Sequence, residues 1–417
     1  MEHCLSPHEA KVEQGLLCIT DDGAVKQSRV NQMLSHILDQ PPRVAVERAK
    51  WFTRSFRETE GLPNNLRWAL ALRTCAENMT VTINTGELIV GQIGSGTRYA
   101  LIYPELRGGW LTELAEAADR EGGKFLLTEE DETCVLEEIV PYWKGRTWHE
   151  GYIRQLPEET RRVLWDAADD YACRGVVNAL TTQDSALVWA LDYEKVLKKG
   201  FLAMGQEFQS ALEALEARPI PDHMERRAFY RAGVITCSAV VTWAGRYADE
   251  AGRLAREERD SARREELLEI ARICRRVPAH PAGSFHEALQ AVWFANAFSR
   301  LEQIVAGQMG LGRIDQYLYP YFKADREKGL LDDDKALELL ECLWLNLSRI
   351  RRLVPTGSIA NYQGYPHFEQ ACLGGQTPDG RDASNELSYL ILQSKKEFPL
   401  DFPDMSVRIH SMTPAPF

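Results

Sequence analysis

Two segments of this sequence enclose polar side chains that could do chemistry within apolar surroundings. Residues 174–191, RGVVNALTTQDSALVWAL, are low in charge, and the polar run TTQDS interrupts them. Residues 307–313, GQMGLGR, form a polar, glycine-rich loop. The first segment predicts strand, loop and strand, with the loop at the rim of a buried sheet. Convergent polar groups in an apolar setting are typical of small-molecule sites, so the two segments favour an enzyme without indicating its reaction.

Other chemical patterns do not stand out. No Ser/His/Asp, Cys/His or HExxH arrangement is apparent, and no spacing of His, Cys and carboxylates suggests zinc. Carboxylates occur in helical charge runs, where solvation is their ordinary role. The GSG at residues 94–96 lacks both the Gly-Lys-Ser/Thr of a P-loop and the GxGxxG pattern, so it predicts a turn.

Composition narrows the class of protein. The formal charge of −12 argues against nucleic acid or an anionic membrane as the main partner. No run of roughly 18 apolar residues could span a bilayer, and the N-terminus lacks a secretory signal. The nine cysteines contain no CxxC pair. We therefore expect reduced, mostly buried thiols and a cytoplasmic protein.

The elements that must position the polar segments are mainly helices. We expect an N-terminal arm over residues 1–40 and one body over residues 41–417. Helices are predicted over 41–61, after Pro63, over 128–145, 193–217 and 224–276, after the capping box at 284–287, over 332–350 and from about Ser384. Short strands are expected within 81–106 and at 405–410. The fold class is α/β and mostly helical, a sheet or barrel wrapped by helices.

Six motifs in order then resemble a known family. They are GELIVG (86–91), YPEL (103–106), PYWKG (141–145), DYEKVL (192–197), GRIDQYLYPYF (312–322) and LGGQTPDGRDASNELSYL (373–390). Together they resemble the N-terminal half of a glycyl radical enzyme, of the pyruvate formate-lyase-like family that includes diol dehydratases, choline lyase and sulfite lyases. The resemblance implies a ten-stranded barrel of two half-barrels inside a helical shell, with this chain forming the first half-barrel.

The same resemblance implies residues that are not found here. The family carries a glycyl radical near its C-terminus and passes it to a cysteine in a Gly-Cys loop, and neither motif occurs. Cys372 is followed by glycines, but its place in the family leads into a strand, so we interpret it as a small buried residue. We expect a portion that ends before the cysteine loop and the glycyl domain. Such a portion would be inactive alone and bind no cofactor, and a radical-SAM activating enzyme would install the radical on the missing part.

The resemblance also suggests candidate substrate contacts. Dehydratases of the family commonly carry Gly-His just before the DYEKV motif, where this chain reads LVWAL (187–191). This departure argues against diol dehydration. Arg174, Asn178 and Gln183 are candidates for binding an anionic sulfonate or carboxylate, because a guanidinium binds oxyanions through two parallel hydrogen bonds. A surface or salt-bridge role for Arg174 stays open. Gln308 is a fourth candidate.

The resemblance implies an anaerobic lyase or formate acetyltransferase-like enzyme that cleaves a C–C, C–O, C–N or C–S bond of a small, possibly anionic substrate. At full length it would be a homodimer. The alternative is a non-catalytic paralogue or a split subunit that binds a partner chain completing the barrel. Arg313, Asp315 and Gln316, which match the family's GRxDQ, are expected to hold a loop and helix together rather than to touch substrate.

Overall fold

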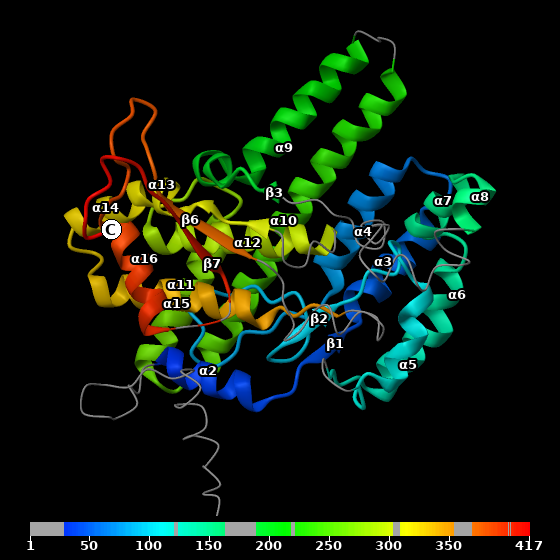
Figure 1. Cartoon of the computed structure of the whole chain (residues 1–417), viewed down its shortest axis with the longest axis horizontal. Helices are drawn as coiled ribbons and strands as arrows, with labels where there is room; N and C mark the ends of the chain where they lie inside the picture. Colours follow the sequence, from blue (N-terminus) through cyan, green and yellow to red (C-terminus); the bar gives the residue numbers. More distant parts are fainter. Residues whose placement is uncertain are drawn as a thin grey trace, which may run out of the picture.

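The computed structural model describes residues 29–120, 124–162, 189–217, 222–302, 309–353, 369–398, 400 and 402–417. Most of these residues are helical, and the strands are short (Figure 1). The N-terminal and middle helices are α2 Arg29–Asp39, α3 Glu47–Glu58, α4 Asn64–Asn78, the 3₁₀ segment η1 Gly109–Glu116, α5 Glu129–Thr133, the π-helical turn η2 Cys134–Ile139, α6 Val140–Trp143, α7 Trp148–Gln155 and α8 Glu158–Arg161. The later helices are α9 Tyr193–Ala217, α10 His223–Glu257, α11 Ser261–Arg276, α12 Phe285–Glu302, α13 Ile314–Tyr317, α14 Tyr319–Glu327, α15 Asp333–Arg349 and α16 Glu386–Glu397.

The paired strands in the described part of the chain are all parallel. β1 Arg43–Ala45 pairs with β2 Tyr99–Leu101, and single bridges extend this sheet to Leu126 on one side and Ile350 on the other. β3 Trp189–Ala190 pairs with β4 Met309–Gly310. β6 Gln370–Gly374 lies between β5 Gly312–Arg313 and β7 Asp404–Arg408. Two adjacent parallel strands are joined by a crossover connection, which is usually a helix. A fold with short parallel strands therefore contains many helices.

Two helices, α12 and α15, form the centre of the core. Nearly every residue of α12 is buried, which is the pattern of a helix surrounded by protein on all sides. Trp243 of α10 packs edge-to-face on Phe294 of α12, and the Tyr247 ring packs on the same Phe294 at a tilted angle. Ahead of the body, α2 buries Val30, Leu34 and Ile37 and packs on α15. The helices therefore enclose one continuous hydrophobic core.

The GELIVG motif is a buried segment without regular secondary structure. Its main-chain groups bond to side chains of the central helices: the Gln290 amide exchanges two hydrogen bonds with Val90, and Asn346 donates to the Ile89 carbonyl at 2.8 Å. Gly91 has φ +129°, and a Cβ there would lie 3.0 Å from Trp293 and Phe294. The motif is thus fixed because buried backbone groups must find partners and only glycine fits.

Two sequence expectations differ from the structure. Residues 43–45 form strand β1 rather than the start of a helix, because their backbone pairs in parallel with β2. Of the one or two short strands expected within residues 81–106, the structure has β2, and the GELIVG segment before it is irregular. The helix expected over 224–276 breaks at residues 258–260, where the Asp260 side chain accepts a hydrogen bond from the Arg263 N–H and caps α11.

Helices α9 and α10 form a hairpin that projects from the body (Figure 1). α9 is kinked at Gly200, which has φ +74°. There the N–H groups of Phe201 and Leu202 donate to the Pro278 and Ala279 carbonyls, and a Cβ on Gly200 would lie 2.4 Å from the Ala279 oxygen. The segment that precedes α12 therefore packs against α9 at this kink and accepts two of its backbone hydrogen bonds. Within the described ranges, no helix has the length and apolar character that crossing a membrane requires.

Candidate active site

The candidate substrate contacts lie outside the part of the chain that the structure describes. Arg174, Asn178 and Gln183 precede β3, and Gln308 directly precedes β4. β3 and β4 pair with Trp189 opposite Met309, so this two-stranded pair joins the two polar segments picked out by the sequence. The described residues that hold these strands in place therefore define the frame of the site.

A buried polar network lies beside this strand pair. Arg300 of α12 is 1% exposed and pairs with Glu369, which is fully buried just before β6. The Arg300 Nε donates to the Asn296 Oδ1 at 2.9 Å, and the Asn296 amide donates to the Tyr193 hydroxyl at 3.0 Å. Burial raises the pKa of Tyr193, so this hydroxyl stays protonated. The network ties together the residues after β3, the end of α12 and the start of β6.

A second buried arginine fixes the C-terminal end of α12. The Arg48 guanidinium donates to the Leu301 carbonyl at 2.9 Å and to Glu105 at 2.8 Å, and it lies over the Phe52 ring. The Tyr103 hydroxyl donates to the Arg300 carbonyl at 2.8 Å. A cation at a helix C-terminus satisfies carbonyls that have no partner within the helix and complements the helix dipole. The helix end that leads to Gln308 is therefore held from the side.

The GRIDQ motif binds the GGQ turn that follows β6. The Asp315 carboxylate accepts from the Gly374 N–H at 2.7 Å and from the Ser388 hydroxyl at 2.6 Å. Arg313 donates to the Gly374 carbonyl at 2.6 Å, and Gln316 donates to the Ala383 carbonyl at 2.8 Å. Burial raises the pKa of Asp315, and the two accepted hydrogen bonds oppose that shift. The expected structural role of Arg313, Asp315 and Gln316 agrees with these contacts.

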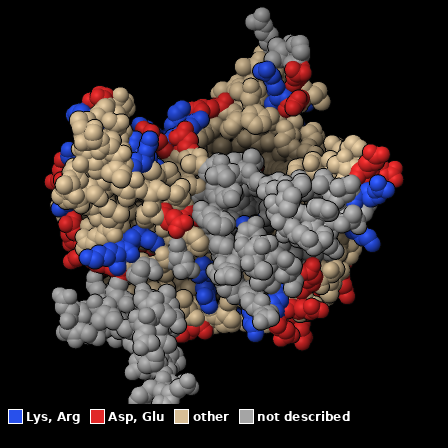
Figure 2. Space-filling view, in the orientation of Figure 1, with Lys and Arg blue, Asp and Glu red and all other residues tan. Residues whose placement is uncertain are grey.

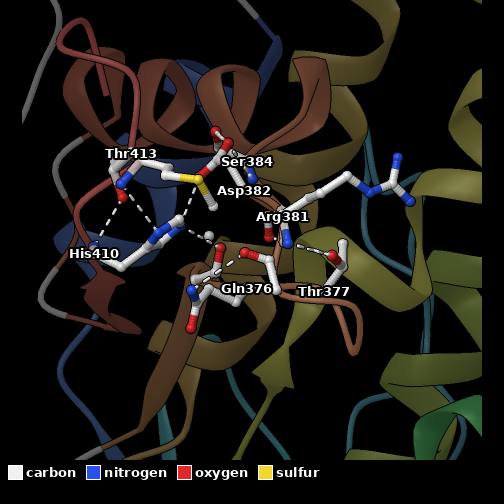
Figure 3. Close-up of polar contacts among 12 residues, drawn as sticks. Gln376, Thr377, Arg381, Asp382, Ser384, His410 and Thr413 are labelled. Atoms are coloured by element: carbon white, nitrogen blue, oxygen red, sulfur yellow. Dashed lines mark hydrogen bonds and ion pairs between the residues drawn. The ribbon is translucent and has the colours of Figure 1, made fainter.

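Figure 3 shows a polar cluster at the C-terminal rim of the same sheet. The His410 Nε2 lies 3.1 Å from the Asp382 Oδ1 and 3.1 Å from the Gly375 carbonyl, and the Ser384 hydroxyl donates to the other Asp382 oxygen. The cluster contains a serine, an aspartate and a histidine, but the serine bonds to the aspartate rather than to the imidazole. This order cannot activate a hydroxyl as in a hydrolase triad, so the cluster joins the turn after β6 to the end of β7.

An apolar groove lies between the α9–α10 hairpin and the body, and Figure 2 shows the hollow under the hairpin. Its volume is about 770 Å³, and its walls come mainly from α4, α9 and α10, with Trp68, Phe208 and Phe229 among them. Glu302, at the end of α12, lines one side. Burial raises the pKa of this carboxyl, while Arg48 acts in the opposite direction.

The described cysteines do not form a reactive centre. Burial raises the pKa of each of the six, to about 12 for Cys75 and Cys342. A raised pKa disfavours the thiolate. Cys372 is half-buried in β6, between two hydrogen-bonded strands rather than in a loop. Within the described ranges, no group of three His, Cys, Asp or Glu residues could hold a metal.

The sequence expectations missed the residues of the buried network. One signal was available: Asn296 and Arg300 lie four residues apart, hence on one face, in the largely apolar C-terminal half of α12. Polar groups on such a helix need partners. Those partners, Tyr193 and Glu369, lie 103 and 69 residues away in the chain, and no local pattern connects them.

Comparisons with known proteins extend over nearly the whole chain. A family model described as pyruvate formate lyase-like matches residues 21–417. Isethionate sulfite-lyase from Nitratidesulfovibrio vulgaris is 43% identical over 413 residues, which cover 98% of this chain and 50% of that protein. The glycerol-bound B12-independent glycerol dehydratase from Clostridium butyricum has a TM-score of 0.86 and 34% identity, over 96% of this chain and 49% of that one. A structure on 1,2-propanediol dehydration in Roseburia inulinivorans has a TM-score of 0.87 and 31% identity, over 95% and 46%.

These comparisons confirm the expected fold class, a mostly helical α/β chain built like part of a glycyl radical enzyme barrel. The chain spans about half the length of the curated relatives it matches. The chain belongs to the pyruvate formate lyase-like family of glycyl radical enzymes.

Proposed function

We propose that these 417 residues form the first half-barrel of a glycyl radical lyase that releases sulfite from a small hydroxyalkyl sulfonate. The observation that carries this proposal is the 43% identity to isethionate sulfite-lyase over 98% of the chain, against 32% for trans-4-hydroxy-L-proline dehydratase from Clostridioides difficile. The absence of a histidine in LVWAL, ahead of DYEKVL, points the same way. We therefore propose cleavage of a C–S bond rather than dehydration of a diol.

In this proposal Arg174, Asn178, Gln183 and Gln308 contact the substrate. A sulfonate is a tetrahedral oxyanion that a guanidinium and amide N–H groups can bind, and Arg174 would supply the charge. Tyr193, Asn296, Arg300 and Glu369 keep the adjoining strands in place. Such a division of labour is common in enzymes, where a rigid frame holds the reacting groups to within a fraction of an ångström.

The radical chemistry requires residues that the described chain does not offer. A glycyl radical would initiate the reaction, which begins with abstraction of a hydrogen atom from the substrate. Among the described cysteines, none is flanked as a Gly-Cys loop requires. We therefore assign the radical glycine and its cysteine to a second half-barrel outside these residues, with a radical-SAM enzyme as activator and a homodimer as the assembly.

Radical formation tests this assignment. The chain is produced under anoxia with the radical-SAM activase, alone and together with a second half-barrel encoded beyond codon 417 or by a neighbouring gene. We expect an organic-radical EPR doublet only when both halves are present. A doublet from the 417 residues alone would overturn the assignment of the radical to the second half. A complex of the two halves that forms no doublet would instead favour a non-catalytic subunit.

Substrate choice is tested separately on the activated assembly. Isethionate, glycerol and propane-1,2-diol are offered in parallel, and sulfite and aldehyde are measured. We expect sulfite from isethionate and no turnover of either diol, and Arg174→Gln should raise the KM for isethionate at least about tenfold. Diol dehydration without sulfite release would refute the sulfonate proposal and leave the radical assignment intact.

A further inference from the structure

A small cavity lies where α12, the end of β2 and the residues after α15 meet. Its walls are Leu101, Tyr103, Arg300, Ile350, Arg351, Arg352 and Leu353. Its inner volume is about 10 Å³, enough for one water-sized group. Ile350 forms a bridge with Tyr99, and the Arg351 N–H donates to the Tyr99 carbonyl at 2.7 Å. The backbone of this wall is therefore fixed beside β2 by one parallel bridge and one hydrogen bond.

Arg300 has a hydrogen-bond donor without an acceptor at this cavity. Its Nε is used by Asn296 and its Nη2 by Glu369, but its Nη1 finds no acceptor among the residues that the structure describes. The side chain is only 1% exposed. A buried guanidinium nitrogen without an acceptor is costly, and native proteins usually satisfy it with a ligand, an ion or water.

The charges around the cavity favour an anion over a neutral occupant. Three of the seven described residues that line the cavity are arginines, and none of the seven is a carboxylate. The nearby Glu369 binds Arg300 on another nitrogen, Nη2. The remaining walls are apolar apart from Tyr103, whose hydroxyl already donates to the Arg300 carbonyl. In such low-dielectric surroundings the attraction between guanidinium groups and a negative charge is weakly screened.

We infer that Arg300, Arg351 and Arg352 form a binding site for one small anion, either a halide or a single oxygen of a sulfonate, carboxylate or phosphate. The inference stands apart from the proposed function, because an anion would bind whether or not the chain performs radical chemistry. Only the identification of that anion with a substrate sulfonate rests on the proposed function.

Bromide is the probe, because its anomalous scattering locates it in crystals and its binding can be followed by stability. The 417-residue chain, or its complex with the second half-barrel, is crystallised in sodium bromide. We expect an anomalous peak within hydrogen-bond distance of the Arg300 Nη1. In solution, bromide should raise the melting temperature saturably, as a ligand specific to the folded state does. Sodium gluconate at equal ionic strength, whose anion is too large for the cavity, should not.

Two variants make the solution test specific. Arg352 is only half-buried, so Arg352→Gln should fold, and we expect its bromide midpoint to rise about tenfold. Arg253→Gln removes the same charge from an exposed ion pair on α10 and should leave the midpoint unchanged. A bromide response equal to that of gluconate, no peak at Arg300, or equal effects of both variants would overturn the anion site. Competition by isethionate would assign the site to a substrate sulfonate, and competition by phosphate or chloride alone to an inorganic anion.

Discussion

The buried frame and the C-terminal rim use the same side-chain chemistry in different surroundings. In the frame, Arg48–Glu105 and Arg300–Glu369 are buried ion pairs that each join elements far apart in the chain. At the rim, Arg381–Asp379 spans two residues within one exposed turn, and Asp382 holds Ser384 and His410 (Figure 3). A buried pair cannot lose one partner cheaply, whereas an exposed pair can exchange its partner for water. The frame therefore fixes the strands around the candidate site, and the rim only shapes a turn.

The largest contrast is expected from removing one arginine in each region. Arg300→Met leaves the Glu369 carboxylate buried without its partner, so the free energy of unfolding should fall by about 3–5 kcal/mol. Arg381→Gln, in a pair whose side chains are 77% and 57% exposed, should leave the free energy of unfolding nearly unchanged. Chemical denaturation of both variants beside the parent chain measures the difference. Similar losses would mean that burial does not separate the two regions.

Two glycines allow a substitution in tightly packed surroundings to be compared with one in open space. Gly91 and Gly145 both have positive φ, so alanine is strained at either position. A Cβ at Gly91 would press on Trp293 and Phe294, whereas at Gly145 it would meet nothing within 4 Å. We expect Gly91→Ala to cost about 2–4 kcal/mol and Gly145→Ala about 1–2 kcal/mol. Thermal unfolding measures both, and equal shifts would show that the GELIVG segment is packed less tightly than its contacts indicate.

Asp315 lies where the two regions meet, and its substitution should have an intermediate effect. Asp315→Asn keeps the size of the side chain but weakens the acceptor for the Gly374 N–H and the Ser388 hydroxyl. The expected loss is about 1–3 kcal/mol. Ser388→Ala removes only one of these bonds and should cost less. Denaturation of the two variants and the double variant tests this order, and strictly additive losses would argue against a shared site at Asp315.

The contribution of the C-terminal rim to stability should depend on pH. The hydrogen bond from Ser384 lowers the pKa of Asp382, and His410 acts in the same direction. A carboxyl with a lowered folded-state pKa stabilises the protein above its ordinary pKa, and this stabilisation is lost as the pH falls through the lowered value. The difference in unfolding free energy between the parent and Asp382→Asn should be constant above about pH 5 and shrink below about pH 4. A difference that instead grows in acid would contradict this ionised, hydrogen-bonded aspartate.

Local patterns in the sequence predicted the elements of this fold better than their connections. The bounds of α9 were predicted from periodicity, and Thr128, Ser284 and Asp332 each cap a helix. The six motifs indicated the family that the comparisons show. The break at Asp260 was missed because a single cap competes with strong helical periodicity on both sides. The partners of Arg300 were missed because pairing across a core depends on how the chain folds back, which short-range spacing does not encode.

The end of α12 is fixed by Arg48 and Tyr103, which bind its last carbonyls from other elements. The residues that follow α12 include Gln308, next to the strand pair of the candidate site. Because two side chains from other elements already hold this helix end, we expect substitutions at Gln308 to cost little stability. The same frame could therefore serve relatives that act on sulfonates, amino acids or diols, with substrate preference changing by a few exchanges beside an unchanged scaffold.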